Sequence, residues 1–198
     1  MITRTAPDKY KGITVFIVPL RQPGYEFTEI KTISDERTNI TYYRDLRVPD
    51  KYRIGPVNGG VKVMAAALTL EQTGGDTYLY GLRHMYRDAL AWAKAPNASR
   101  GGARPIDDPS LRRQLAETAV RLEVGGALGR YCYWAFEAGR VQKQDGPMAK
   151  LFCSEAFMWC SQWMMAAAGP EALEVGYEGA GVLEYMARRC IPGTIYAG

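Results

Sequence analysis

The sequence is poor in the residues that bind metal ions and in clusters that bind nucleic acid. Its 198 residues include one histidine and four cysteines, and no two cysteines form a C-x-x-C pair. Structural zinc sites use Cys and His ligands at short spacing, so no metal site is predicted and the cysteines are expected to be reduced, buried thiols. The net charge is only +4 and the basic residues form no block, so nucleic-acid binding is not expected.

Long apolar runs are also missing. No stretch approaches the roughly 20 apolar residues that cross a membrane, so no membrane span is predicted. The N-terminal residues are polar and lack the apolar core of a secretory signal, so a cytoplasmic location is expected. An apolar fraction of 47% with 23% charged residues is typical of a globular protein with one sizeable core or two modest ones.

Residues 1–55 have the pattern of a small β-domain. Gly12–Pro19 is rich in β-branched and aromatic residues, Tyr25–Ile33 alternates apolar with polar residues, and Thr38–Val48 is a third candidate strand. Turn-forming residues separate the three stretches. Three strands cannot close a sheet on themselves. We therefore expect the end of a larger antiparallel domain, with its other strands upstream of Met1.

Residues 56–198 have the apolar spacing of helices. A first helix is interrupted by Gly74 and Gly75, and a second begins at Asp108-Pro109, an N-cap followed by proline at the first helical position. Pro147–Ala168 and Gly181–Cys190 are the third and fourth. Long helices with short connections predict an antiparallel four-helix bundle. The predicted fold class is α+β, mainly α: a partial antiparallel β-domain followed by this bundle.

The predicted third helix is apolar nearly all round, because Leu, Phe, Met and Trp occupy most of its turns. Such a helix is normally buried on more than one side. We therefore expect it to make a subunit contact, in a homo- or hetero-oligomer. A helical interaction module is one function that this helix favours.

Two motifs resemble those of the acyl-CoA dehydrogenase family. Arg37–Pro49 followed by Gly55–Met64 is similar to the pattern F-x-D-V-R-V-P … G-x-x-x-x-G-W, and Ile195–Gly198 resembles the stretch I-Y-(E/A/G)-G-T. The resemblance covers nearly the whole chain. It implies the end of a middle β-domain (1–55) and most of a C-terminal helical bundle (56–198). The chain is thus expected to be a fragment cut at both ends and inactive alone.

The resemblance implies an FAD-dependent oxidoreductase that forms a trans-2,3 double bond in an acyl-CoA. A glutamate removes the α-proton, the flavin takes the β-hydride, and electrons pass to an electron-transfer flavoprotein. Many members place the glutamate after the tyrosine of the final motif, where this chain has Ala197. A second branch supplies it from the helix after the β-domain, where Glu71 matches. In a site emptied of water, the neighbours Leu68 and Leu70 would raise the pKa of the Glu71 carboxyl toward a useful value.

Further site residues follow from the same resemblance. The backbone N–H of Ala197 would polarise the thioester carbonyl, and the substrate contacts would be Leu68, Tyr196 and Gly198. Glu178 lies in Tyr177-Glu178-Gly179, which copies the base motif but precedes the fourth helix, so Glu178 is expected to be a loop residue.

The flavin motifs of the family are largely missing. An R-x-x-F-G stretch is replaced by Lys94–Ile106, and of Q-x-x-G-G-x-G only Gly169 remains, as the candidate FAD-binding residue. This departure favours an alternative function, a non-catalytic or half-site subunit of a heteromeric acyl-CoA dehydrogenase.

Overall fold

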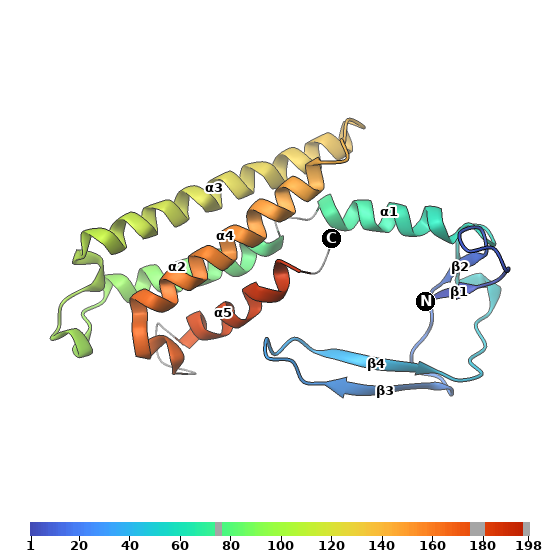
Figure 1. The fold of residues 1–198 in the computed structure, drawn as a ribbon, viewed down its shortest axis with the longest axis horizontal. Coiled ribbons are helices and arrows are strands. Elements are labelled where there is room, and N and C mark those ends of the chain that lie inside the picture. Colours follow the sequence, from blue (N-terminus) through green and yellow to red (C-terminus); the bar gives the residue numbers. More distant parts are fainter. Residues whose placement is uncertain (74–76, 175–180, 196–198) are drawn as a thin grey trace. The chain divides into compact units, whose positions relative to one another are not determined.

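A computed structural model describes residues 1–73, 77–174 and 181–195. The chain forms two compact units, Met1–Leu70 and Glu71–Gly198 (Figure 1). The boundary falls inside a helix, so the helical pattern that begins near residue 56 starts within the first unit. Each unit has its own secondary structure and is described separately.

The first unit contains two small antiparallel sheets. Strands β1 (Ile2–Arg4), β2 (Ile13–Phe16) and β5 (Arg53–Ile54) form one, in the order β1-β2-β5. Strands β3 (Tyr25–Ile30) and β4 (Thr38–Tyr43) form the other. Each of the three predicted strands is confirmed but shorter. All six residues of β4 are exposed.

A closed ring of hydrogen bonds fixes the start of helix α1 (Gly60–Thr73) to the first sheet. The backbone N–H of Asn58 donates to Thr14 Oγ1 over 2.9 Å, and Thr5 Oγ1 donates to Asn58 Oδ1 over 2.6 Å. The Thr5 proton is thereby used, so the Thr14 hydroxyl donates to Thr5 Oγ1 over 2.7 Å. Thr14 is fully buried, and its polar atoms are satisfied within the ring.

The second unit is a bundle of four helices, as predicted. They are α2 (Tyr78–Lys94), α3 (Pro109–Glu137), α4 (Asp145–Ala168) and α5 (Gly181–Gly193). Asp108 caps α3 by accepting from the Ser110 N–H over 2.8 Å. The first helix predicted from the sequence is two helices, α1 and α2. Three 3-10 turns follow α2 and α4, at Ala98–Arg100, Pro105–Asp107 and Gly169–Leu173.

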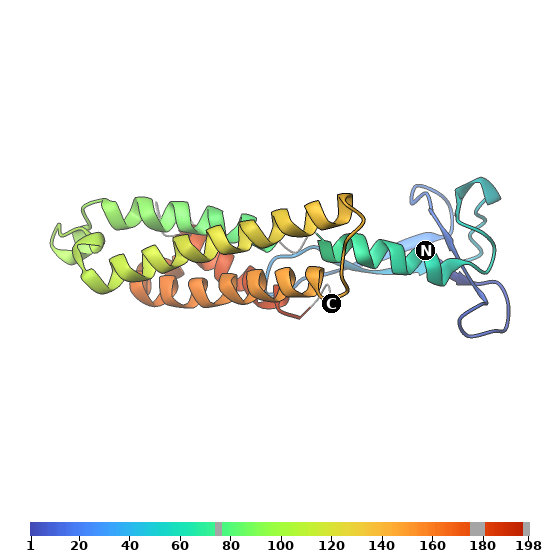
Figure 2. The same ribbon diagram turned by 90° about the horizontal axis from the view of Figure 1, so that it is seen from above.

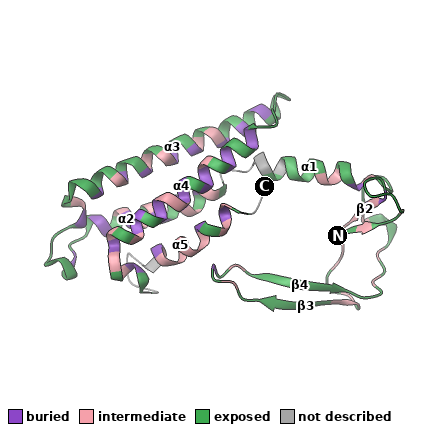
Figure 3. Ribbon diagram, viewed as in Figure 1, coloured by how far each residue is buried: buried purple, intermediate pink, exposed green. Residues whose placement is uncertain are grey.

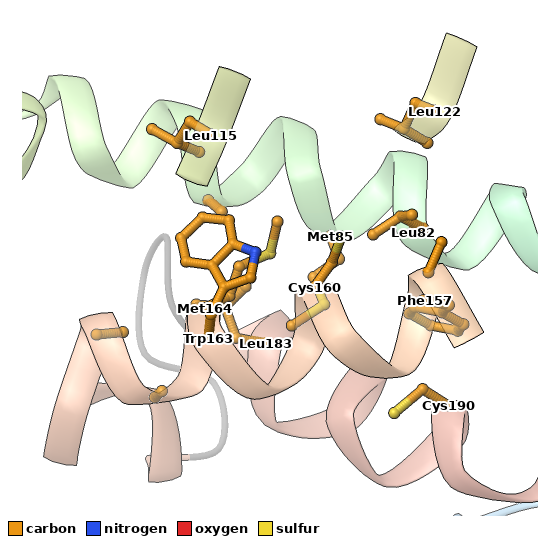
Figure 4. Close-up of a cluster of buried hydrophobic side chains, with 14 of the residues drawn as sticks. Leu82, Met85, Leu115, Leu122, Phe157, Cys160, Trp163, Met164, Leu183 and Cys190 are labelled. Carbon is orange, nitrogen blue, oxygen red and sulfur yellow. The ribbon is translucent and has the colours of Figure 1, made fainter. Parts of the chain in front are cut away.

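Helix α4 lies at the centre of this bundle, against α2, α3 and α5 (Figures 1 and 2). Side chains from all four helices meet in one core (Figure 4). The core includes Leu82, Leu122, Phe157, Met164 and Leu183.

Much of the apolar surface of the third helix is covered within the chain, and the expected subunit contact on this helix stays a prediction. Of the large apolar side chains of α4, only Met148 and Leu151 are exposed (Figure 3). Neighbouring helices of the same chain cover its apolar sides.

Buried polar groups in the bundle pair with one another. The Trp163 indole N–H donates to Thr118 Oγ1 over 3.2 Å, and the Thr118 hydroxyl donates to the Gln114 carbonyl over 2.9 Å. The four cysteines are buried, and none of them forms a disulfide within the described residues. Burial raises the pKa of the Cys160 and Cys190 thiols, which keeps them neutral.

Glycine allows α2, α3 and α4 to approach closely at one point. A Cβ at Gly125 of α3 would lie 2.9 Å from the Leu79 side chain of α2 and 3.1 Å from Cys153 Sγ of α4. At the next position, Gly126, a Cβ would meet only the ends of arginine side chains, the nearest being Arg130 Nη1 at 3.3 Å. Gly125 and Gly126 thus form a matched pair. Packed side chains enclose the first position but not the second.

We predict opposite effects of alanine at these two positions. Gly125→Ala overpacks the core, which costs about 1–3 kcal/mol and outweighs the gain of up to ~1 kcal/mol in helix propensity. Gly126→Ala keeps that gain, because the Arg130 side chain can move aside. Urea unfolding followed by circular dichroism will measure both. Equal effects of the two changes would show that Gly125 does not set the helix spacing.

Candidate functional site

The proposed base, Glu71, lies near the end of α1 and is exposed. Within the described residues it makes no hydrogen bond or ion pair. Leu68, one turn before it, is 52% exposed. The described part of the chain thus leaves Glu71 open to solvent and does not enclose it in an apolar site. Its role as base stays a prediction.

Gly169, the candidate flavin residue, has a clear structural function. It ends α4 with φ +65° and ψ −141°, a conformation that residues with a Cβ rarely adopt. Nothing lies within 4 Å of a Cβ built at this position. The backbone alone accounts for glycine here, and flavin binding by Gly169 stays a prediction. Tyr196, Ala197, Gly198 and Glu178 lie outside the described residues.

The carboxylate of Glu171, two residues beyond Gly169, joins the turn after α4 to the loop after α2. Glu171 accepts hydrogen bonds from Trp92 Nε1 over 3.1 Å, from Asn97 Nδ2 over 2.9 Å and from the Ser99 hydroxyl. Trp92 lies in the last turns of α2, and the other two follow that helix. We call these four residues the Glu171 cluster.

The charge of Glu171 is stabilised by these contacts. The Ser99 hydrogen bond lowers the pKa of the Glu171 carboxyl most, and Asn97, Trp92 and nearby Arg100 lower it further. Arg100 Nη2 also donates to the Ala167 carbonyl over 2.6 Å, and its guanidinium lies 5.5 Å from the Trp92 ring centre. A second link thus joins the loop after α2 to the end of α4.

The Glu171 cluster lies beside the two places where this chain departs from the flavin motifs of the family. Asn97 and Ser99 belong to Lys94–Ile106, and Glu171 lies two residues beyond Gly169. The N–H and O–H donors of the cluster already bond to a carboxylate of the same chain. Next to the cluster, a hollow of about 200 Å³ is lined by Arg100, Asp108, Trp163 and their neighbours. Arg100 is exposed beside Glu171, so this end of the bundle carries both signs of charge.

Sequence reasoning missed this cluster. Glu171 lies 72 to 79 residues beyond its partners, so no local pattern connects them. The local signal is the Asn97-Ala98-Ser99 turn, in which Asn97 Oδ1 accepts from the Ser99 N–H over 2.9 Å. This local signal predicts the turn, but it does not predict that the turn binds the Glu171 carboxylate.

Two other kinds of feature are absent from the described residues. No group of three or more His, Cys, Asp and Glu side chains there is arranged to hold a metal ion. Among the same residues, no helix is long and apolar enough to span a membrane.

Comparison with known proteins identifies the family. The family model "Acyl-CoA dehydrogenase, C-terminal domain" matches residues 58–198. Acyl-CoA dehydrogenase FadE26 of Mycobacterium tuberculosis is 29% identical over 216 residues, which covers 100% of this chain and 52% of that protein. FadE29 of the same organism is 35% identical over 162 residues, covering 77% of this chain and 39% of that protein.

Solved structures agree with this family. The structure named Tcur3481-Tcur3483 steroid ACAD has a TM-score of 0.85 at 27% identity and covers 100% of this chain and 51% of its own. The ChsE4–ChsE5 complex from Mycobacterium tuberculosis has a TM-score of 0.82 at 29% identity, covering 99% and 51%. The chain belongs to the acyl-CoA dehydrogenase family, whose model covers more than half of its residues. It spans about half the length of FadE26 and of these two solved relatives.

We predict that Glu171 stabilises the bundle in a pH-dependent way. Its pKa is lower in the folded chain, so its contribution is present above the unfolded pKa of about 4.3 and is lost as the pH falls through the folded value. Glu171→Gln should lose about 1 kcal/mol at neutral pH, a value reduced for solvent exposure. Urea unfolding at a series of pH values will measure this. A deficit that persists unchanged in acid would contradict the role of the charge.

Proposed function

We propose that the complete protein is an FAD-dependent acyl-CoA dehydrogenase that introduces an α,β double bond into an acyl-CoA thioester. The observation that carries this is the family match over residues 58–198, together with relatives of 27–29% identity that cover the whole chain. Because the chain spans about half the length of those relatives, the activity is proposed for the complete protein. Its four buried cysteines, which form no disulfide within the described residues, fit a reducing, cytoplasmic location.

In this proposal Glu71 is the proton acceptor. Its position on α1 leaves the carboxylate free of partners within the described chain, so a substrate can use it. FAD, when bound, supplies the hydride acceptor, and an electron-transfer flavoprotein takes the electrons onward. Residues outside the described segments then hold the flavin phosphates and exclude water.

The remaining candidate residues act on the substrate and the cofactor. The Ala197 backbone N–H donates to the thioester carbonyl, a role that needs no side chain and therefore tolerates alanine. Leu68, Tyr196 and Gly198 line the acyl-CoA site, and Gly169 lies against the flavin. One solved relative is named a steroid ACAD, so a steroid-linked acyl-CoA is a substrate class to test.

The Glu171 cluster favours a second candidate, a half-site subunit of a heteromeric dehydrogenase. In this arrangement the chain contributes Glu71 to one active site but no phosphate-binding loops to a neighbouring flavin. The two solved relatives have names that join two proteins, Tcur3481 with Tcur3483 and ChsE4 with ChsE5. An unequal pair of chains would then share one complete flavin site.

The base is tested by Glu71→Gln in the complete protein. This change keeps the shape of the side chain but removes the proton acceptor, so flavin reduction by substrate should slow by roughly 10²–10⁴-fold. Stopped-flow absorbance of the flavin measures the rate. Acyl-CoA binding should stay near normal, and Glu178→Gln is the matched control with little effect. Adding Ala197→Glu to the Glu71→Gln protein should restore part of the rate. Near-normal reduction by Glu71→Gln would remove Glu71 from the mechanism.

Flavin content separates the two candidates. The 198-residue chain alone should hold no FAD at micromolar concentration, because it spans about half the length of its relatives and lacks the part of the β-domain expected to enclose the flavin ring. The complete protein purified alone should hold one FAD per chain if it is a self-sufficient enzyme. A half-site subunit should gain flavin only when a companion chain is co-expressed. Flavin absorbance per protein mass gives the ratio, and bound flavin in the 198-residue chain would contradict the prediction.

A further inference from the structure

The N-terminal end of helix α4 has a backbone donor without an acceptor. Gln144, the residue before the helix, makes no side-chain capping hydrogen bond. In the first turn, the N–H groups of Asp145 and Met148 donate to carbonyls of the preceding loop, and Pro147 has no N–H. Gly146 is buried, yet its N–H makes no hydrogen bond within the described residues. This donor also lies at the positive end of the helix dipole.

A buried lysine lies one turn further along the same side of α4. Lys150 is only 7% exposed, and within the described residues it makes no hydrogen bond or ion pair. Residues four positions apart differ by about 40° around a helix axis, so Lys150 and Gly146 share one side. In the described chain, no side-chain nitrogen or oxygen that is sealed from solvent lacks a partner. The stem of Lys150 is therefore buried while its amino group reaches solvent.

The side chain of Lys150 leads back toward the unpaired N–H. Side chains on a helix lean toward its N-terminus, over the turn that precedes them. The turn before Lys150 contains Gly146, which has no side chain to occupy that space. The ammonium group and the N–H can thus donate to two atoms of one ligand. A buried lysine normally has a partner, and this ligand would provide it.

The charges at this end of α4 favour a negative ligand. Residues 138–150 contain three basic side chains and one acidic one. Arg140 and Lys143 are exposed and form no ion pair within the described part of the chain. The acidic residue, Asp145, accepts a hydrogen bond from the Gln142 N–H over 2.8 Å. It lies about 140° around the helix from Lys150, so its carboxylate does not take the place of the ligand.

We propose that the start of α4 is a binding site for a carboxylate, which accepts hydrogen bonds from the Gly146 N–H and the Lys150 ammonium group. One positive charge and two donors match a singly charged group with two oxygen atoms. The carboxylate belongs either to a small molecule or to an Asp or Glu side chain outside these 198 residues. The proposal rests on the two unpaired donors and does not depend on the proposed catalytic function.

A titration with sodium acetate tests the site in the 198-residue chain. The Gly146 amide resonance, followed by NMR, should shift with acetate and reach a plateau, whereas sodium chloride at equal ionic strength should give no plateau. Lys150→Met keeps the buried stem but removes the charge, so it should weaken acetate binding at least about tenfold. Lys143→Met is the matched control. It removes an exposed charge near the same helix end and should change binding by less than about threefold.

Circular dichroism confirms that each variant is folded. Equal weakening by the two variants would overturn the proposal, because it would show a general effect of positive charge. The wild-type titration decides the matter even if Lys150→Met does not fold. The same response of Gly146 to acetate and to chloride would overturn the proposal.

The complete protein distinguishes the two sources of the carboxylate. If the ligand is a small molecule, the complete protein should respond to acetate as the 198-residue chain does. If it is a side chain, acetate should have no effect, and a carbodiimide should couple Lys150 to an Asp or Glu residue through an amide bond, with the lost water converting the reagent to a urea. Mass spectrometry identifies the coupled peptide. Coupling to Asp145, or neither coupling nor an acetate response, would overturn the proposal.

Discussion

The bundle depends on close contact at two glycines. At Gly125 a side chain would collide with Leu79 and Cys153, and at Gly81 with the Phe157 ring at 2.8 Å. Each glycine therefore brings a neighbouring helix close enough for α4 to touch several helices at once. The central position of α4 follows, and with it the burial of an almost wholly apolar helix. The core residues contributed by the other helices all pack around this arrangement.

Polar groups close the end of the bundle, and their charge limits what that end can bind. The Glu171 cluster and the Arg100–Ala167 contact join the α2 loop to the end of α4. A carboxylate held at this place by three donors stabilises the loops and disfavours another anion beside it. Stability and phosphate binding thus compete for the same donors. In this chain these donors bond to Glu171 and so contribute to stability.

Local patterns were sufficient to predict most of the fold and the family. Alternation of apolar and polar residues and β-branched stretches predicted the strands. Apolar residues spaced three and four apart, together with the Asp108 cap, predicted the helices. The motif at residues 37–64 indicated the family. The sequence could not show whether a helix that is apolar all round packs in its own bundle or against another subunit. Either neighbour would present an apolar surface to it, so the pattern is the same. The Glu171 cluster was missed because its members are far apart in the chain. The surroundings of Glu71 depend on residues beyond those described.

The hydrogen-bond ring at the start of α1 makes the two units assemble differently. Its bonds join Asn58 to residues 44 and 53 positions earlier, so the first turn of α1 gains these bonds only after long loops of the first unit have closed. Loop closure over such separations slows folding, whereas contacts within and between successive helices form quickly. The bundle helices can therefore form on local contacts, while the sheet junction forms late. On a growing chain, the N-terminal unit would still be incomplete when its last strand emerges.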